Sequence, residues 1–114
     1  MSETTVSVVI PMRNEEKYIG KCLDSLLAQE WDGGPLEVVV VNGESEDRSK
    51  QIVESMMPTF PRLKLLDNPR RITPVSLNMG VKAATGDVII ILGAHSYVAK
   101  DFVSKNLHFL DTMA

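Results

Sequence analysis

A chain of 114 residues has room for one domain with a real core, but it is small for an enzyme that must hold two substrates. Its hydrophobic fraction of 44% and charged fraction of 24% are close to globular averages, which argues against disorder. The net charge of −3 comes from interleaved acidic and basic residues, so no basic face points to nucleic acid as a partner.

The N-terminus has no basic stretch followed by a long apolar one, so it does not predict a signal peptide. The apolar runs VVVV and VIIIL are far shorter than the roughly 18 residues that a membrane span needs. The single Cys22 falls within an apolar helical pattern and cannot form an internal disulfide. These features favour the reducing cytoplasm. A full-length protein is in addition expected to be able to associate with the cytoplasmic face of the membrane.

Strands and helices alternate along the chain. Residues 6–11 (VSVVIP) predict a strand that ends at Pro11. Residues 14–29 predict a helix with Glu15 and Glu16 in its first turn, where the helix dipole favours carboxylates. The apolar positions of this helix are Tyr18, Ile19, Cys22, Leu23, Leu26 and Leu27.

The middle of the chain repeats this order. Residues 36–42 (LEVVVVN) predict the second strand, and Ser45 is expected to cap a helix that carries Glu46 and Asp47 at its start and ends before Pro58. The inner face of this helix would consist of Ile52, Val53, Met56 and Met57. Residues 62–68 (RLKLLDN) are a shorter and more polar strand, which suits a sheet edge.

The last third predicts a helix, a strand and a helix. Thr73 as cap and Pro74 as first helical residue would open a helix that runs to Thr85 and stops at Gly86. Residues 88–92 (VIIIL) have no charge and predict a strand buried on both faces. The last helix is marked by Phe102, Val103, Asn106, Leu107 and Leu110.

Four β–α units joined by right-handed crossovers predict an α/β fold with a doubly wound, mostly parallel sheet of about four strands and helices on both faces. The turns at residues 11–15, 42–47, 67–71 and 93–97 follow the strands and should meet along one edge of the sheet. Ligands of open parallel sheets bind at that edge.

The polar side chains of these turns have two interpretations, because they could bind a ligand or only stabilise the fold. The turn NGESED can present backbone N–H groups to a phosphate, but its carboxylates would repel one, so a neutral base or ribose suits it better. It matches neither a P-loop nor a dinucleotide fingerprint. Arg70 and Arg71 are either phosphate ligands or solvated surface residues. His95, directly after a buried strand, is either a ligand or a structural hydrogen-bonding group.

Three segments in order resemble the inverting glycosyltransferases of family 2, which have the GT-A fold. VSVVIPMRNEEKYIGKCLDSLLAQ is similar to the opening strand and helix of that family, and EVVVVNGESEDRSKQIV to its second strand and base-binding turn. LNMGVKAATGDVIIILGAHSYVAKDFV is similar to the segment with the Asn-x-Gly, Ala-x-Gly-Asp and acidic motifs. The closest likeness is to the succinoglycan-biosynthesis subgroup, whose acidic motif commonly reads Asp-Ala-His.

The resemblance implies the Rossmann-like half of a GT-A fold that holds a nucleotide-sugar donor, with a UDP-sugar favoured. The implied reaction transfers the sugar to a saccharide or lipid-linked acceptor in polysaccharide biosynthesis. The implied nucleotide-binding residues are Pro11, Arg13, Glu15, Asn42, Glu44 and Arg71.

The metal site is less regular than the family pattern. His95 stands where the second acid of the usual Asp-x-Asp motif would be, and would hold Mn²⁺ or Mg²⁺ together with the diphosphate. Gly93 replaces the first Asp, and Asn42 replaces an Asp of the base-binding turn. Arginines 13, 70 and 71 are able to supply positive charge instead, which leaves a metal-independent variant open.

In the resembled family, the acceptor site and catalytic base lie in the second half of the domain, after the point that corresponds to Ala114. No catalytic base is therefore assigned, and residues 1–114 are expected to be a truncated part that is inactive alone and inclined to self-associate. Gly93 and Asn42 also favour an alternative, a non-catalytic GT-A-like module that binds a nucleotide or a partner. A nucleotidyltransferase would need a glycine-rich, basic phosphate loop, which PMRNEEKY does not offer.

Overall fold

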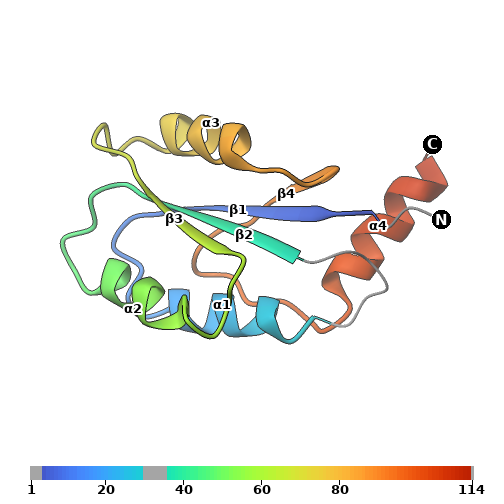
Figure 1. The fold of residues 1–114 in the computed structure, drawn as a ribbon, viewed down its shortest axis with the longest axis horizontal. Helices are drawn as coiled ribbons and strands as arrows, with labels where there is room; N and C mark the ends of the chain where they lie inside the picture. Colours follow the sequence, from blue (N-terminus) through green and yellow to red (C-terminus); the bar gives the residue numbers. More distant parts are fainter. Residues whose placement is uncertain (1–3, 30–35, 114) are drawn as a thin grey trace.

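A computed structural model of this chain describes residues 4–29 and 36–113, and side chains as far as residue 108. At its centre is a parallel sheet of four strands in the order β3-β2-β1-β4 (Figure 1). The strands are β1 (Val6–Met12), β2 (Leu36–Asn42), β3 (Leu63–Asp67) and β4 (Val88–Ile91). The predicted four-stranded parallel sheet is confirmed, and β3 lies at an edge, as its short and polar sequence indicated.

Helices flank the sheet on both faces, as predicted. α1 (Ile19–Leu27) and α2 (Ser49–Met56) lie on one face, and α3 (Thr73–Ala83) lies on the other (Figure 1). α4 (Phe102–Met113) comes last, and its Val103 joins the core on the α1 side. Leu110, an expected apolar position of this helix, lies outside the described side chains. Within the described residues, no helix combines the length and apolar character needed to cross a bilayer.

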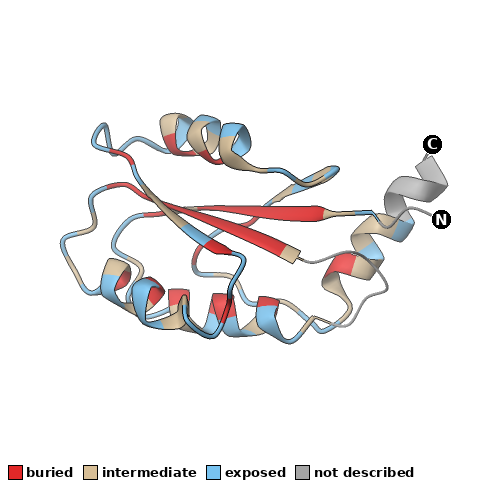
Figure 2. Ribbon diagram, in the orientation of Figure 1, coloured by how far each residue is buried: buried red, intermediate tan, exposed pale blue. Residues whose placement is uncertain are grey.

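β1 and β2 contribute to two cores because successive side chains of a strand point to opposite faces. Val8, Ile10 and Val40 belong to the larger core, on the side of α1 and α2. Val9 belongs to the smaller core beneath α3, and both strands are buried along almost all of their length (Figure 2). α3 approaches β1 closely at Gly80, where a Cβ atom would lie only 2.3 Å from Cγ1 of Val9.

The first two helices begin later than predicted. α1 begins at Ile19, so Glu15 and Glu16 precede it instead of forming its first turn. α2 begins at Ser49 without a side-chain cap, so the expected cap at Ser45 is wrong. The reason is that side-chain oxygens of each turn accept hydrogen bonds from backbone N–H groups of the other turn, which holds both segments in a non-helical conformation. Two predicted inward positions of α1, Tyr18 and Leu27, are exposed.

The ends of α3 also differ from the prediction. Thr73 is the first helical residue and not the cap, because Ile72 occupies the N-cap position with an extended backbone (φ −78°, ψ 141°) and no capping side chain. The helix ends at Ala83, before the predicted Thr85. The backbone N–H and the hydroxyl of Thr85 instead donate to the carboxylate of Glu37 in β2.

β4 is not buried on both faces, so that prediction is wrong. Ile89 and Ile91 are 38% and 49% exposed, whereas Ile90 on the opposite face packs against the larger core. Among the described strands β4 pairs only with β1, and α3 packs on β1 and β2. An edge strand with one uncovered face therefore has the same apolar sequence as a fully buried one.

Candidate functional site

The turns after the four strands meet at the carboxyl edge of the sheet, as predicted. β1, β2 and β3 end in register, because Met12 lies beside Asn42 and Asn42 beside Asp67. β4 stops earlier, with Ile91 beside Val9, so the Gly93–Tyr97 turn begins close to the last residues of β1. Side chains that are distant in sequence are therefore brought together at one edge.

Of the cavities along this edge, two bring together residues of the predicted site. The first, here called the His95 cavity, has a volume of about 270 Å³ and is lined by Pro11, Met12, Arg13, Glu15, Arg71, Thr73, Ser76, Gly93, Ala94 and His95. The second, here called the Asn42 cavity, has a volume of about 410 Å³ and is lined by Asn42, Glu44, Ser45, Lys50, Asp67, Pro69 and Arg71. Arg71 lines both cavities. All seven residues predicted for the nucleotide and metal therefore line one cavity or the other.

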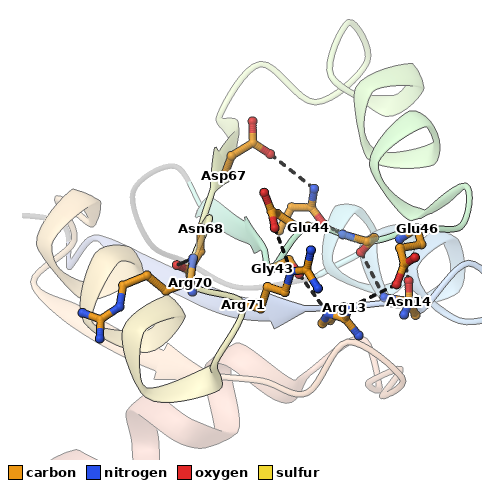
Figure 3. A network of polar contacts seen from close by, with 11 residues as sticks. Arg13, Asn14, Gly43, Glu44, Glu46, Asp67, Asn68, Arg70 and Arg71 are labelled. Atoms are coloured by element: carbon orange, nitrogen blue, oxygen red, sulfur yellow. Dashed lines mark hydrogen bonds and ion pairs between the residues drawn. The ribbon is translucent and has the colours of Figure 1, made fainter.

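The turn after β1 is tied to the turn after β2 by hydrogen bonds. The backbone N–H of Asn14 donates to Oγ of Ser45 (2.9 Å). Oδ1 of Asn14 accepts from the backbone N–H of Glu46 (2.7 Å) (Figure 3). Nε of Arg13 donates to the carbonyl of Gly43 (3.0 Å), while its Nη2 lies 3.3 Å from Oε1 of Glu46. Arg13 is therefore held at the junction of the two turns.

Asn42 is almost completely buried, and both polar atoms of its side chain have protein partners. Its Nδ2 donates to Oδ1 of Asp67 (3.2 Å), and its Oδ1 accepts from the backbone N–H of Ser45 (3.0 Å). Lys50 donates to the other oxygen of Asp67 (3.0 Å) and is the main reason why the pKa of that carboxyl is lowered. Asn42 thus fixes the ends of β2 and β3, and its amide retains one N–H and one lone pair for a ligand.

Arg71 and Glu44 form an ion pair across the boundary between the cavities. Nε of Arg71 lies 2.7 Å from Oε1 of Glu44, and both side chains are about half exposed (Figure 3). Gly43 makes the close approach possible, because a Cβ atom there would lie 2.9 Å from the carbonyl oxygen of Arg71. Arg70, in contrast, points away from this network (Figure 3). Of the two predicted arginines, only Arg71 lines the cavities.

The first three turns each contain one residue other than glycine with a positive φ angle. These angles are 55° at Asn14, 54° at Glu44 and 67° at Arg71. Such a conformation is unfavourable for a residue with a side chain, and it persists only where surrounding contacts enforce it. The hydrogen bonds of Asn14, and the bond that the backbone N–H of Arg71 donates to the carbonyl of Asn68 (3.2 Å), are contacts of this kind. The edge is thus a preformed surface.

His95 extends from the fourth turn toward the first. Its Nδ1 lies 3.0 Å from Oε2 of Glu15, and its ring meets the Tyr18 ring edge-on at 6.2 Å between centroids. The His95 side chain is 68% exposed, so it is not a buried structural histidine. At Gly93 an added Cβ would contact nothing closer than Oγ of Ser96 at 3.5 Å, so the position has room for a side chain.

The described residues contain no group of three or more histidine, cysteine or acidic side chains able to hold a metal ion. Cys22 lies beneath the fourth turn with its Sγ 3.9 Å from the carbonyl of Gly93. Burial, and secondarily the charge of Glu15, raises the pKa of Cys22 to about 11, so this thiol stays neutral at pH 7 and is a poor metal ligand. His95 and Glu15, with Nδ1 and Oε2 3.0 Å apart, are a pair of metal-ligating groups at this edge.

Sequence reasoning missed four residues that line the cavities. Lys50 and Asp67 belong to the Asn42 cavity, while Thr73 and Ser76 belong to the His95 cavity. Asp67 was detectable, because it ends a strand in the same way as Asn42 does. The other three lie on helices that follow the turns, and no local pattern distinguishes them from ordinary polar helix residues.

A family model described as glycosyl transferase family 2 matches residues 7–114. The dolichyl N-acetyl-alpha-D-glucosaminyl phosphate 3-beta-D-2,3-diacetamido-2,3-dideoxy-beta-D-glucuronosyltransferase of Methanococcus voltae is 35% identical over 104 residues, which cover 90% of this chain and 32% of that protein. The match therefore leaves most of that relative without a counterpart here.

Solved structures of two glycosyltransferases are similar as well. Staphylococcus aureus TarS 1–349 in complex with UDP-GlcNAc is 29% identical with a TM-score of 0.78, covering 95% of this chain and 31% of that one. The mannosyltransferase PcManGT from Pyrobaculum calidifontis, in complex with GDP-Man and Mn²⁺, is 28% identical with a TM-score of 0.84, covering 96% and 33%. This chain spans about a third of the length of these proteins. The likeness confirms the GT-A type of α/β fold, while membership of the succinoglycan subgroup stays a prediction.

Proposed function

This chain belongs to glycosyl transferase family 2, and we propose that it forms the donor-nucleotide site of a glycosyltransferase that acts in polysaccharide biosynthesis. The donor is a nucleotide-sugar, and the acceptor is a saccharide or a lipid-linked saccharide. The activity for which the Methanococcus voltae relative is named, on a dolichyl-phosphate-linked sugar, supports an acceptor of this class. The inverting course of the reaction and the preference for a UDP-sugar are part of the same proposal.

The observation that carries the proposal is the pair of adjoining polar cavities that share Arg71. Their volumes of about 270 and 410 Å³ are together in the range of small-molecule sites, roughly 300–1,000 Å³. In the proposed arrangement the base and ribose lie against the Pro11–Glu15 turn and Asn42. The diphosphate then faces Arg71 and the His95 cavity.

The electrostatics of the edge agree with this arrangement. The carboxylates of Glu44, Glu46 and Asp67 are each paired with a cation, so they repel the nucleotide less than their number implies. The pair between Arg71 and Glu44 is solvent-exposed, and exposed ion pairs contribute only about 0–1 kcal/mol. A diphosphate that carries about two charges is therefore able to recruit Arg71 at little cost.

A divalent metal, Mn²⁺ or Mg²⁺, is part of the proposal. The similar mannosyltransferase was solved with Mn²⁺, and the exposed imidazole of His95 at the carboxyl edge of this sheet is a suitable ligand. A bound divalent cation supplies charge neutralisation for a departing diphosphate. Arg13 and Arg71 add positive charge in the same cavity, and they would carry this task in a metal-independent variant.

Calorimetric titration with UDP and GDP, each with and without Mn²⁺, tests the proposal. We expect Arg71→Ala to weaken nucleoside diphosphate binding about ten- to a hundredfold, because it removes a charge-assisted contact of about 1.5–3 kcal/mol. Arg70→Ala is the matched control, since it removes the same charge from the neighbouring residue that points away from the cavities. Equal losses in both variants would contradict the assigned role of Arg71. If the unaltered chain binds neither nucleotide, the non-catalytic module is the better interpretation.

A further inference from the structure

We propose that Glu15 and His95 together form a two-residue site for a divalent cation, with the carboxylate of Glu15 replacing the acid that Gly93 lacks. The inference rests on the proposed donor-nucleotide site, because the nucleoside diphosphate supplies the remaining oxygen ligands. Glu15 was predicted as a nucleotide contact, and its new role is to hold the metal. Its charge would then act on the diphosphate through the cation.

The geometry of the pair is suitable for one ion. Nδ1 of His95 lies 3.0 Å from Oε2 of Glu15. Two adjacent ligands of an octahedral ion with bonds of about 2.1 Å meet at right angles and therefore lie about 3.0 Å apart. A cation is able to bind both atoms with little rearrangement. The mixed nitrogen and oxygen donors suit Mn²⁺ better than Mg²⁺, which prefers oxygen.

The surroundings hold both side chains in this position. The backbone N–H of Glu15 donates to Oγ of Ser49 (2.7 Å), and its carbonyl accepts from the N–H groups of Tyr18 and Ile19 at the start of α1. The Glu15 side chain is only 22% exposed, which restricts its rotamers. The rings of Tyr18 and His95 lie in a T-shaped arrangement with 6.2 Å between their centroids. The pair is therefore preorganised, and both residues line the His95 cavity.

Two protein ligands give a weak site on their own. Sites of this kind commonly bind a divalent ion through one or two side chains and substrate phosphates. Binding of Mn²⁺ and of the diphosphate should therefore be mutually dependent, because each completes the site of the other. The free chain should bind Mn²⁺ poorly, and addition of UDP or GDP should strengthen that binding.

The test measures Mn²⁺ binding by calorimetry and by the electron paramagnetic resonance signal of free Mn²⁺, with UDP or GDP present. We expect Glu15→Gln and His95→Ala each to weaken Mn²⁺ binding about tenfold or more. Glu16→Gln and His108→Ala are the matched controls, and they should bind Mn²⁺ as the unaltered chain does. In EDTA, Glu15→Gln should lower nucleotide affinity much less than it does in Mn²⁺, because the Glu15 carboxylate acts on the diphosphate through the cation.

Two outcomes would overturn the inference while the donor site stands. In the first, Mn²⁺ raises nucleotide affinity equally in Glu15→Gln and in the unaltered chain. In the second, Glu15→Gln weakens nucleotide binding in EDTA as strongly as in Mn²⁺, which would make Glu15 a direct nucleotide contact. If neither nucleotide binds the unaltered chain under any condition, the proposed function fails together with this inference. Glu15→Asp, which keeps the charge but shortens the side chain, serves if the glutamine variant does not fold.

Discussion

Replacement of Glu37 by glutamine should destabilise the fold, although this residue is far from the candidate site. Glu37 is 4% exposed, yet its carboxylate accepts hydrogen bonds from Ser7 (2.6 Å) and from the backbone N–H of Thr85 (2.9 Å). Nζ of Lys64 lies 2.7 Å from its second oxygen. This network joins β1, β2 and β3 to the turn that precedes β4.

The pKa of Glu37 gives the size of the expected effect. Burial alone would raise this pKa, but the hydrogen bonds from Lys64, Ser7 and Thr85 outweigh it and lower the pKa from 4.5 to about 2. One pKa unit corresponds to about 1.4 kcal/mol, so the charged carboxylate contributes roughly 3 kcal/mol at neutral pH. For a domain of this size we expect Glu37→Gln to lower the melting temperature by about 10 °C.

The pH dependence has a definite sign. Because the folded-state pKa is lowered, the unfolded chain binds more protons between pH 4.5 and about 2. The contribution of Glu37 is therefore complete above pH 4.5 and is lost as the pH falls toward 2. Urea unfolding of both proteins at several pH values should show the difference in stability shrinking across that window.

Glu54→Gln is the control for the loss of one carboxylate, since Glu54 is exposed on α2. It should leave the unfolding midpoint nearly unchanged at every pH. The reasoning is refuted if Glu37→Gln and Glu54→Gln have the same stability at pH 7. It is equally refuted if the loss caused by Glu37→Gln stays constant down to pH 2.

Three glycine positions give further predictions. Gly80→Ala should lower the free energy of unfolding in urea by about 1–3 kcal/mol, because the new Cβ would lie 2.3 Å from Val9. Gly20→Ala in α1 meets nothing within 3.4 Å and should raise the free energy of unfolding by about 0.5–1 kcal/mol. The prediction is wrong if both substitutions stabilise the fold or both destabilise it. Gly93→Asp has room beside Ser96 and should strengthen Mn²⁺ binding in the presence of UDP; unchanged calorimetric affinity would show that the metal does not approach residue 93.

The element order and most of the core were predictable because they depend on local patterns. The runs VVVV and VSVVIP are apolar over their whole length, as strands covered on both faces must be. Errors arose where a tertiary contact replaced the local preference. Ser45 has the chemistry of a helix cap, but its hydroxyl accepts from Asn14 instead. Thr85 continues a helical pattern, but Glu37 binds its backbone and hydroxyl.

The site was predicted residue by residue, while its pairings were not. Glu15 and His95 were assigned to different tasks, because they are 80 positions apart and nothing local relates them. They meet only because β4 pairs with β1, which brings the fourth turn beside the first. If β4 paired with β3 instead, Glu15 and His95 would lie far apart along the carboxyl edge of the sheet. The sheet order β3-β2-β1-β4 therefore brings the two candidate ligands into one metal site. The carboxylate that residue 93 lacks is then supplied by Glu15 from the neighbouring strand end.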